Sequence, residues 1–393
     1  MNRIPDKIIC FCNSNRSWGG GEKWHLDAAL GLAARGCKVF VMAGRDTPLF
    51  ERVRQYPQLQ MCPARFGNLS FLNPLLVNTC AAYFKHNRIS RVILGLPTDL
   101  KAAGLAARRA GVPGIYYRRG SALPVRNTFF NRLLYNNFLT GLIVNSRETA
   151  RLVFAANDTL MDKRKVHIIP NGLDLAAFDA AFAAASPVFR RDDDTLVIGN
   201  AGRLTEQKAQ HFLLYMSRAL LDAGIRHRLV LAGDGERREE LQTLAADLAL
   251  GETVVFAGFQ SDMASFWRSI DLFVLSSLWE GFGYVLAEAQ LAAKPVIAFD
   301  ANSMPEVVAH NKTGLLLPLP GPEESPDAVG VRLADAVRSL ADNPVLAAQL
   351  AADGRAHCCQ AYDLEKRIDD LYALLWPDTA SPVSRGDYGK DEE

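Results

Sequence analysis

Two glutamates stand out in this sequence because they lie among apolar residues. Glu280 and Glu288 are eight residues apart in the stretch SSLWEGFGYVLAEAQLAAKPVIAF, which runs from Ser276 to Phe299. A carboxylate accepts hydrogen bonds from both hydroxyls of a vicinal diol. The two acids are therefore suited to hold one sugar and one ribose, although Glu288 is also compatible with an exposed helix position that has no function.

The flanking pattern places the two acids on different elements. DLFVLSS predicts a strand that ends near Ser276, and the next helix is expected to begin near Gly283. Glu280 then lies in the loop after the strand, and Glu288 lies in the second turn of the helix. Gly281 and Gly283 leave the backbone N–H groups between them open to an anion or to sugar hydroxyls.

Two cations follow another predicted strand. In GNAGRLTEQKA, Arg203 comes directly after the strand, and Lys208 stands five residues later at the start of a helix. Two cations near a helix N-terminus suit a diphosphate. The alternative is a pair of solvated surface cations.

Three further loops are glycine-rich, and each could be only a turn. LAGDGE carries Gly233 and Asp234, and AGF carries Phe259. NSNRSWGGGEKW follows the first strand and leads into a helix that begins near Glu22, which would point backbone N–H groups at a ligand. The GGGE stretch does not match GxGxxG, and the second strand ends in VMAGR without a ribose-binding acid, so a nicotinamide dehydrogenase is disfavoured.

The elements that must position these residues follow the same alternating pattern in both halves of the chain. Short apolar runs alternate with amphipathic stretches, which predicts an α/β protein with parallel sheets in two Rossmann-like domains. The first set of strands is KIICFC, KVFVMAG, RVILGL, GIYYR and GLIVNS, and the second is TLVIGNAGR, HRLVLAGDGE, TVVFAGF, DLFVLSS and KPVIAF. We expect an N-terminal domain over 1–180, a linker in VHIIPNGLDLAAFDAAFAAASPVFRRDDD, a C-terminal domain over 190–358 and a disordered tail over 378–393.

Composition narrows the class of protein. The chain has 393 residues, 49% of them hydrophobic, and this length predicts two domains. No apolar run approaches the roughly 20 residues that cross a bilayer, and the apolar stretch near the N-terminus is too short for a signal peptide. The seven cysteines form no CxxC pair and the seven histidines form no HExxH-type pair, so we expect reduced thiols in the cytoplasm and no metal site.

Together these motifs resemble the retaining GT-B glycosyltransferases of family 4, the glycosyl transferase group 1 type. The resemblance is carried by E-x7-E in EGFGYVLAEA, with GGGE, PNGLD, AGRLTEQK, GDG and MPEVV, between residues 19 and 306. It implies two domains whose parallel sheets face each other across a cleft. The N-terminal domain would bind the acceptor, and the C-terminal domain would bind a nucleoside diphosphate sugar such as a UDP-hexose. No bound metal or other cofactor is implied.

The resemblance also implies roles for individual residues. Arg203 and Lys208 would neutralise the diphosphate, Glu280 would hold the donor sugar, and these three would form the catalytic set. Glu288 would hold the ribose. The remaining donor-side residues would be Gly20, Gly21, Gly233, Asp234, Phe259, Phe282, Gly283 and Tyr284. The last helix, near 362–376, would return to the N-terminal domain.

One departure concerns the acceptor side. Many relatives carry a histidine after the fifth strand, whereas this chain reads YYRRGSALP there, with Arg118, Arg119 and Ser121. The pattern therefore supplies no candidate base. A same-face displacement, in which a leaving phosphate oxygen deprotonates the acceptor, needs none.

Charge is distributed unevenly along the chain. Residues 1–178 contain 25 Lys and Arg against 10 Asp and Glu, while the rest contains 19 against 33. In YYRRGSALPVRNTFFNRLLYNNF, Arg126 and Arg132 alternate with aromatic residues, either as the solvent side of a core-facing helix or as a surface for anionic lipid. We expect a cytoplasmic enzyme, peripheral on the inner face of the cell membrane, with a glycolipid or lipopolysaccharide-core acceptor. No nucleic-acid-binding motif accompanies the basic residues.

Two other hypotheses stay open from the sequence. A non-hydrolysing sugar-nucleotide epimerase would share the two-domain architecture but would need catalytic carboxylates and a histidine in the cleft. A non-enzymatic nucleotide-binding module would have no use for a sugar-holding glutamate.

Overall fold

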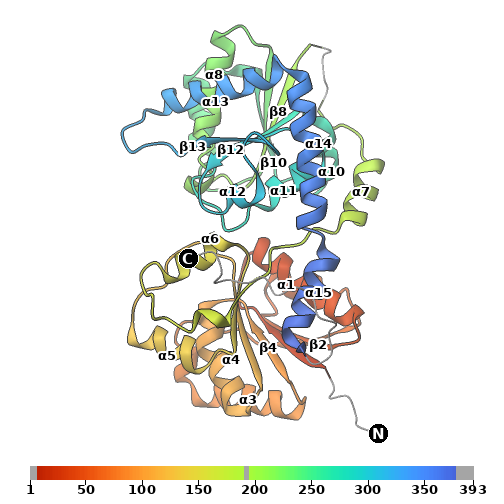
Figure 1. Ribbon diagram of the computed structural model, residues 1–393, viewed down its shortest axis with the longest axis vertical. Helices are drawn as coiled ribbons and strands as arrows, with labels where there is room; N and C mark the ends of the chain where they lie inside the picture. Colours follow the sequence, from red (N-terminus) through yellow and green to blue (C-terminus); the bar gives the residue numbers. More distant parts are fainter. Residues whose placement is uncertain (1–6, 190–193, 378–393) are drawn as a thin grey trace, which may run out of the picture. The chain divides into compact units, whose positions relative to one another are not determined.

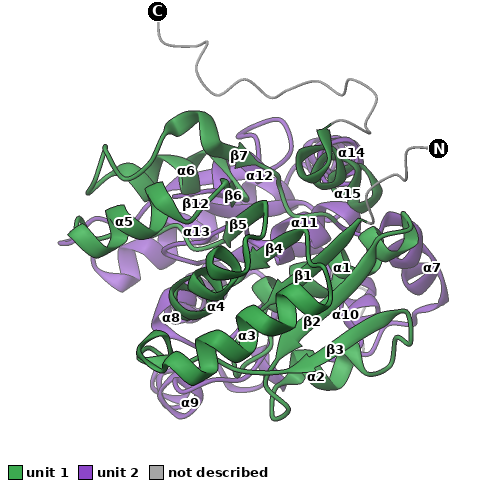
Figure 2. Cartoon of the chain, turned by 90° about the horizontal axis from the view of Figure 1, so that it is seen from below, with its two compact units in different colours: residues 1–172, 364–393 green, residues 173–363 purple. Residues whose placement is uncertain are grey.

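The computed structural model of the chain describes residues 7–189 and 194–377. The chain divides into two compact units, which Figure 2 distinguishes by colour. Unit 1 comprises the residues up to Gly172 together with those from Leu364 onward, and unit 2 runs from Leu173 to Asp363.

Unit 1 is built on a seven-stranded parallel sheet with the order β3-β2-β1-β4-β5-β6-β7. Its strands are β1 (Ile8–Cys12), β2 (Lys38–Ala43), β3 (Leu59–Pro63), β4 (Arg91–Leu94), β5 (Gly114–Arg119), β6 (Gly141–Val144) and β7 (Val166–Ile168). Its helices before the crossover are α1 (Gly20–Ala34), α2 (Pro48–Val53), α3 (Pro74–His86), α4 (Pro97–Ala110), α5 (Phe129–Asn137) and α6 (Arg147–Phe154), with short 3-10 turns η1 (Ser70–Leu72) and η2 (Lys163–Lys165).

Both faces of this sheet are buried, as is usual for parallel sheets. Successive residues of β1 point to opposite faces, so that Cys10 and Cys12 belong to one hydrophobic core and Ile9 and Phe11 to the other. The first core is covered by α3, α4, α5 and α6, and the second by α1 and α2. This double burial explains why β1 reads as a continuous apolar run instead of an alternating one.

Unit 2 contains a six-stranded parallel sheet with the order β10-β9-β8-β11-β12-β13. Its strands are β8 (Leu196–Ala201), β9 (His227–Ala232), β10 (Val254–Gly258), β11 (Leu272–Leu275), β12 (Val296–Asp300) and β13 (Leu315–Pro318). Its helices are α7 (Leu175–Ala184), α8 (His211–Asp222), α9 (Arg238–Asp247), α10 (Met263–Ser269), α11 (Tyr284–Leu291), α12 (Met304–Val307), α13 (Pro326–Ala341) and α14 (Pro344–Ala361), with turns η3 (Glu206–Lys208) and η4 (Gly251–Thr253).

Several helices of both units start with the same local signal. In α2, α3, α13 and α14 a proline occupies the first turn, where its missing N–H costs no hydrogen bond. The residue before it caps the helix with a side-chain oxygen that accepts from the backbone. These capping residues are Thr47, Asn73, Ser325 and Asn343.

The chain returns to unit 1 through its last described helix, α15 (Leu364–Leu375), which lies beside α1 in Figure 1. Ile368, Leu371 and Leu375 complete the core under α1. A side chain at Gly31 would bring its Cβ to 2.7 Å from Cγ1 of Ile368, so the close approach of the two helices depends on this glycine. At the end of α1, the Arg35 guanidinium donates to Asp369 at 2.7 Å.

The ten strands predicted from the sequence are all present, and the three that the prediction missed are β3, β7 and β13. All three lie at sheet edges. An edge strand is less buried and tolerates proline, which is why β3 and β13 can end in Pro63 and Pro318 and give a weak apolar signal. The predicted linker was wrong over much of its length, because it contains β7 and α7. The expected tail over 378–393 lies outside the described residues.

Candidate functional site

The loops that carry the predicted donor-side residues emerge at one edge of the unit 2 sheet. Because its strands are parallel, the loops after β8, β9, β10, β11 and β12 all leave from their carboxyl ends. These loops hold Arg203 and Lys208, Gly233 and Asp234, Phe259, Glu280, and Ser303 respectively. The fold thus gathers at one edge residues that are far apart in the sequence.

An ion pair between Lys208 and Glu280 forms the centre of this edge. The Lys208 Nζ donates to Oε1 of Glu280, and the two side chains are only 14% and 9% exposed. The hydroxyl of Ser277 donates to the same oxygen at 2.8 Å. A buried charge is tolerated when it is paired and hydrogen-bonded, so each ion stabilises the other inside the protein.

Hydrogen bonds fasten the loops on either side of this pair. The Leu278 N–H donates to the Gln207 carbonyl at 2.8 Å, and the Gln207 amide donates back to the Trp279 carbonyl at 2.7 Å. The Ser276 hydroxyl donates to the Lys208 carbonyl at 2.8 Å, and the Ser303 hydroxyl donates to the Glu280 carbonyl at 2.9 Å. The backbones that carry the cation and the carboxylate are therefore fixed before any ligand is present.

Sequence analysis did not identify Ser277, Ser303 and Gln207 as part of the site. Ser277 and Ser303 are fully buried. A buried serine directly after an apolar strand is unusual, because such a hydroxyl needs a partner. The doublet at the end of DLFVLSS was the available signal for Ser277. No local pattern pointed to Ser303, which follows a different strand.

Steric restriction sets the shape of the loops after β8 and β9. A Cβ on Gly233 would stand 1.9 Å from the Gly202 carbonyl oxygen, and the backbone at Gly233 has a φ of 142°. Only glycine fits this position. The Leu204 N–H then donates to the Asp234 carbonyl at 3.0 Å and joins the two loops, while the exposed Asp234 carboxylate lies 3.6 Å from Arg238.

Arg203 differs from Lys208 in its surroundings. Its side chain is exposed and forms no ion pair with any residue that the structure describes, whereas its backbone carbonyl accepts from the Gln210 amide at 2.9 Å. The structure thus holds the Arg203 backbone in place and leaves its guanidinium at the surface. Phe259, which is 77% exposed after β10, is likewise positioned without a covering group.

The helix that carries Glu288 begins where the sequence predicted. Gly283 precedes the first residue of α11 and has a φ of 77°, a left-handed conformation that favours glycine. Phe282 is buried against the rings of Tyr284 and Tyr362, with centroids 5.3 and 5.0 Å away. Glu288 is half-buried in the second turn of α11.

Unit 1 has a polar cluster at the carboxyl edge of its own sheet. The Glu22 carboxylate, in the first turn of α1, is buried and accepts from the side-chain amides of Asn13 at 3.2 Å and Asn15 at 2.8 Å. These bonds tie the segment after β1 to the helix that begins at Gly20 and Gly21. Glu22 appeared in the GGGE motif, but its binding partners could not be predicted.

Arg118 is the last but one residue of β5, at the carboxyl end of the strand. Its guanidinium is buried, donates to Oδ1 of Asn171 at 2.7 Å and stacks 5.0 Å from the Trp24 ring. Arg119 donates to the Leu123 carbonyl at 2.6 Å, and Ser121 is exposed.

A histidine does reach this edge, but it comes from α1. Nδ1 of His25 lies 2.9 Å from the Gly21 carbonyl and donates to it in the tautomer that carries the hydrogen on Nδ1. Burial lowers the pKa of His25 to about 4; the hydrogen bond to Gly21 opposes this shift and the nearby Arg118 charge adds to it. His25 is therefore neutral at physiological pH. Sequence analysis missed it because α1 brings it to the sheet from the first crossover.

The aromatic and basic segment before β6 is partly a core element. In α5, Leu134 and Tyr135 are buried against the sheet. Arg132 in the same helix and Arg126 before it are exposed, and Arg132 donates to Asn127 at 3.1 Å. This agrees with a helix that packs on the core and keeps its arginines in solvent.

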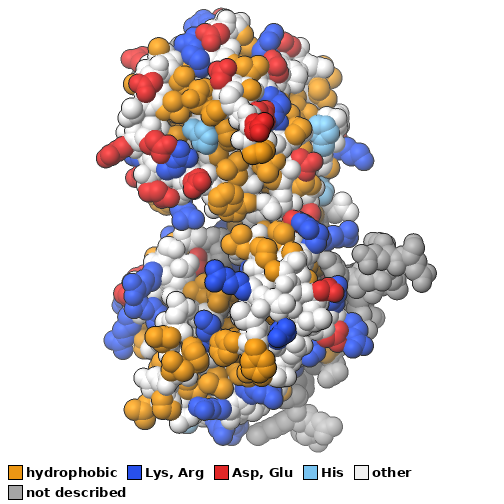
Figure 3. Space-filling view, turned by 90° about the vertical axis from the view of Figure 1, so that its left-hand side faces the viewer, with side chains coloured by type: hydrophobic (Ala, Val, Ile, Leu, Met, Phe, Trp, Pro, Cys, Tyr) orange, Lys and Arg blue, Asp and Glu red, His pale blue; other side chains and the backbone are white. Residues whose placement is uncertain are grey.

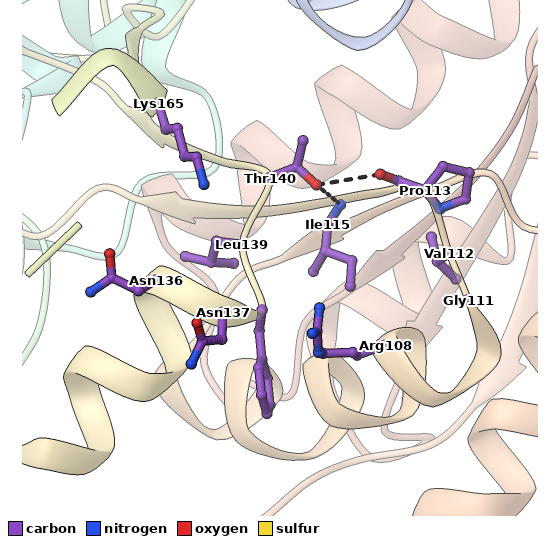
Figure 4. Close-up of a pocket in the computed structure, with 11 residues that line it drawn as sticks. Arg108, Gly111, Val112, Pro113, Ile115, Asn136, Asn137, Leu139, Thr140 and Lys165 are labelled. Atoms are coloured by element: carbon purple, nitrogen blue, oxygen red, sulfur yellow. Dashed lines mark hydrogen bonds between the residues drawn. The ribbon is translucent and has the colours of Figure 1, made fainter. Parts of the chain in front are cut away.

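Unit 1 also contains a pocket of about 460 Å³, shown in Figure 4. Its lining includes Arg108 from the last turns of α4, Lys165 before β7, and Thr140, whose hydroxyl lies 3.4 Å from the Pro113 carbonyl. Pro113 and Thr140 precede β5 and β6, so this pocket lies at the amino ends of the strands. It is at the opposite edge of the sheet from Gly20, Gly21 and Arg118 and is not part of the candidate site.

Neither a metal centre nor a membrane span is found in the described ranges. No group of three or more His, Cys, Asp or Glu residues within 7–189 and 194–377 is arranged to hold a metal ion. Over the same residues, no helix combines the length and the apolar character needed to cross a bilayer.

Comparison with known proteins identifies the family. Residues 182–357 match the model described as glycosyl transferases group 1, and residues 18–177 match the model described as glycosyltransferase family 4. The chain therefore belongs to the family 4 glycosyltransferases, a family of retaining hexosyltransferases with the GT-B fold. The predicted fold class, two Rossmann-like domains of the GT-B type, is confirmed.

The chain spans about half the length of the curated relatives that it matches. EpsF of Bacillus subtilis, described as a candidate glycosyltransferase, is 34% identical over 213 residues, which is 50% of this chain and 54% of EpsF. The lipopolysaccharide core biosynthesis glycosyltransferase LpsD of Rhizobium meliloti is 33% identical over 218 residues, 54% of this chain and 58% of LpsD. The crystal structure of Anabaena Alr3699/HepE with UDP-glucose has a similar fold, with a TM-score of 0.75 at 22% identity over 94% of this chain and 99% of HepE.

Proposed function

We propose that this protein transfers a hexose from a UDP-hexose to a hydroxyl of a glycolipid or lipopolysaccharide-core type acceptor, with retention of the anomeric configuration. The observation that carries the proposal is the buried Lys208–Glu280 pair at the carboxyl edge of unit 2. The similarity to LpsD supports the acceptor class, and the fold shared with HepE, whose structure contains UDP-glucose, supports the donor.

In this proposal Lys208 and Glu280 separate when the donor binds, and each then holds a different part of it. The diphosphate carries more negative charge than one carboxylate, so it competes for Lys208 and draws the exposed Arg203 toward it. Glu280 is then free to accept hydrogen bonds from the hydroxyls of the sugar. Ser277 keeps the carboxylate oriented while its partner changes.

The neighbouring loops supply the remaining donor contacts. Backbone N–H groups at Phe282, Gly283 and Tyr284, at the start of α11, would bond the sugar or its phosphate. Glu288 would hold the ribose, and the exposed Phe259 would cover the base. Gly233 and Asp234 would line the loop beside the phosphates. Gly20 and Gly21, at the start of α1, are also proposed as donor-binding residues.

The reaction step needs no base from the protein. The bond between the anomeric carbon and the phosphate oxygen breaks, and the acceptor oxygen bonds to the same face of that carbon. The acceptor proton passes to an oxygen of the leaving phosphate. Lys208 and Arg203 stabilise the charge that develops on the diphosphate, which is the role that a metal ion fills in other enzymes. Activity is therefore expected to be independent of metal ions.

The acceptor side is assigned to unit 1. Arg118, Arg119 and Ser121 lie at or just after the carboxyl end of β5, and Arg126 and Arg132 are exposed nearby. The excess of Lys and Arg in the first 178 residues, 25 against 10 acids, favours an anionic acceptor or membrane surface. The enzyme would then work at the cytoplasmic face of the cell membrane without spanning it.

The test is incubation with a panel of nucleotide sugars, with and without a lipopolysaccharide-core acceptor. Nucleotide release that depends on the acceptor supports the transferase. An isomerised donor would instead indicate an epimerase, and binding without turnover of any donor would indicate a nucleotide-binding module. Either of these two results would overturn the proposal.

A further inference from the structure

Five large apolar side chains of unit 1 are unusually exposed and come from two neighbouring segments. They are between 53 and 78% exposed, and we call them the rim patch: Leu69, Leu72, Leu75, Leu123 and Phe129. Leu69, Leu72 and Leu75 surround η1 and the first turn of α3, while Leu123 and Phe129 belong to the segment that leads into α5. The rings of Phe71 and Phe130 pack 5.4 Å apart and hold the two segments together.

The rim patch lies at a defined edge of the sheet. Its segments follow β3 and β5, so both emerge from the carboxyl ends of parallel strands. The start of α1, with Gly20 and Gly21, and Arg118 near the end of β5 are at the same edge. The exposed apolar residues therefore border the edge at which the acceptor is proposed to bind.

The stretch of chain that contains the rim patch is strongly basic. Residues 61–140 contain eleven Lys and Arg but a single acid, Asp99, and Asp99 is fully buried. Arg126 and Arg132 are exposed on either side of Phe129 in the sequence. On the face that carries α5, Figure 3 shows hydrophobic side chains gathered on unit 1 with Lys and Arg around them.

The exposed apolar residues and the basic surroundings in the sequence together indicate the kind of partner. Clusters of exposed apolar residues usually mark a binding surface. The absence of exposed acids among residues 61–140, all of which the structure describes, calls for an anionic partner. A membrane interface with anionic lipids offers both, because its headgroups attract cations and its acyl boundary accepts leucine and phenylalanine.

We propose that the rim patch inserts into the interface of an anionic membrane, with Arg126 and Arg132 at the level of the lipid headgroups. The carboxyl edge of the unit 1 sheet then faces the bilayer surface, and the hydroxyl of a lipid-anchored acceptor reaches it without leaving the membrane. The membrane contact stands on the rim patch alone, whereas its link to the acceptor rests on the proposed function.

The experiment measures the partition of the full chain onto vesicles in the absence of nucleotide sugars. Vesicles of phosphatidylcholine alone are compared with vesicles that also contain phosphatidylglycerol. The apolar variant is Leu72→Ser with Phe129→Ser, the charge variant is Arg126→Gln with Arg132→Gln, and the matched control is Val345→Ser in unit 2. Val345 is 80% exposed and lies far from residues 61–140 in the sequence. An unchanged melting temperature and UDP affinity verify that each variant is folded.

We expect wild-type binding only with phosphatidylglycerol, weaker at high salt. The apolar variant should lose roughly tenfold or more in partition, since each inserted side chain contributes a substantial hydrophobic transfer energy. The charge variant should bind more weakly and with a smaller salt dependence, and the control should bind like wild type.

Two results would overturn the inference. They are the same weak binding of the wild type to both kinds of vesicle, and normal binding by the apolar variant. Loss of self-association in the apolar variant, without any vesicle binding by the wild type, would instead assign the patch to a second copy of the chain. Membrane binding without acceptor-dependent turnover would leave the inference intact and reject the proposed function.

Discussion

Removal of one partner from the Lys208–Glu280 pair should destabilise unit 2 by more than the pair itself contributes. The Lys208→Met variant leaves the Glu280 carboxylate, 9% exposed, with the hydroxyl of Ser277 as its remaining side-chain partner. The Glu280→Gln variant keeps the shape of the side chain and an oxygen that can accept from Ser277. Methionine also preserves most of the packing of the lysine stem.

The magnitude follows from burial. Breaking a fully buried ion pair at one partner costs about 3–5 kcal/mol. Because both side chains keep slight exposure, we expect about 3 kcal/mol for Lys208→Met. Glu280→Gln should cost less, about 1–2 kcal/mol, since Lys208 is 14% exposed and its flexible stem can turn its charge toward water. The double variant should be more stable than the sum of the two effects predicts, with a coupling of about 1–3 kcal/mol.

The assay should report on unit 2 by itself, without bound nucleotide. Hydrogen exchange of the buried strands β8 and β11 in increasing urea gives the free energy of unfolding for this part of the chain. Strands of unit 1 in the same samples serve as an internal control and should not change. Strictly additive effects of the two substitutions would refute the conclusion that the cation and the carboxylate hold each other in place.

Three other predictions concern the metal, a buried histidine and a glycine. Turnover should survive excess EDTA, and a loss restored by manganese or magnesium would refute the proposed role of Lys208 and Arg203. Because the pKa of His25 is about 4 in the folded state, the unfolded state takes up its proton first as the pH falls. The stability of unit 1 should therefore decrease between about pH 6.5 and 4, by up to roughly 3 kcal/mol from this group, and His25→Gln should remove that part of a urea-unfolding profile. Gly233→Ala should destabilise unit 2 by about 3 kcal/mol or more, because its Cβ would meet the Gly202 carbonyl at 1.9 Å. Gly321→Ala, whose Cβ would meet nothing within 4 Å, is the matched control and should be neutral in the same thermal denaturation.

The central strands could be predicted from the sequence because burial on both faces makes them continuous apolar runs. β1 and β11 are examples, with every residue buried. The edges could not be predicted in this way, since β7 is short and only partly buried. The return of α15 to α1 depends on a contact between Gly31 and Ile368, which are distant in the sequence. The resemblance to a family, and not the local pattern, indicated that return.

The candidate site, too, could be predicted from the sequence only in part. The types and spacing of Lys208 and Glu280 indicated diphosphate and sugar chemistry, and the parallel topology placed them at one edge. Their direct contact could not be predicted, because it depends on how the loops after β8 and β11 pack. The partners Ser277 and Ser303 act through single hydrogen bonds that leave no periodic trace in the sequence.

The exposed apolar residues around η1 were missed for a different reason. A leucine in a loop is ordinarily counted as core, and only the structure shows that Leu69 and Leu72 face solvent. The aromatic and basic pattern before β6 did draw attention to the same region, since Phe129 lies between Arg126 and Arg132.

The proposed donor site is tested most directly by comparing turnover with UDP affinity in Glu280→Gln. If Glu280 holds the donor sugar in the reactive arrangement, turnover should fall by about 10²-fold or more while UDP binds almost as tightly as to the wild type. The Lys208→Ala variant is the companion measurement and should weaken both, because the diphosphate is common to donor and product. Near-normal turnover of Glu280→Gln with saturating donor and acceptor would contradict the assignment of this carboxylate to the sugar.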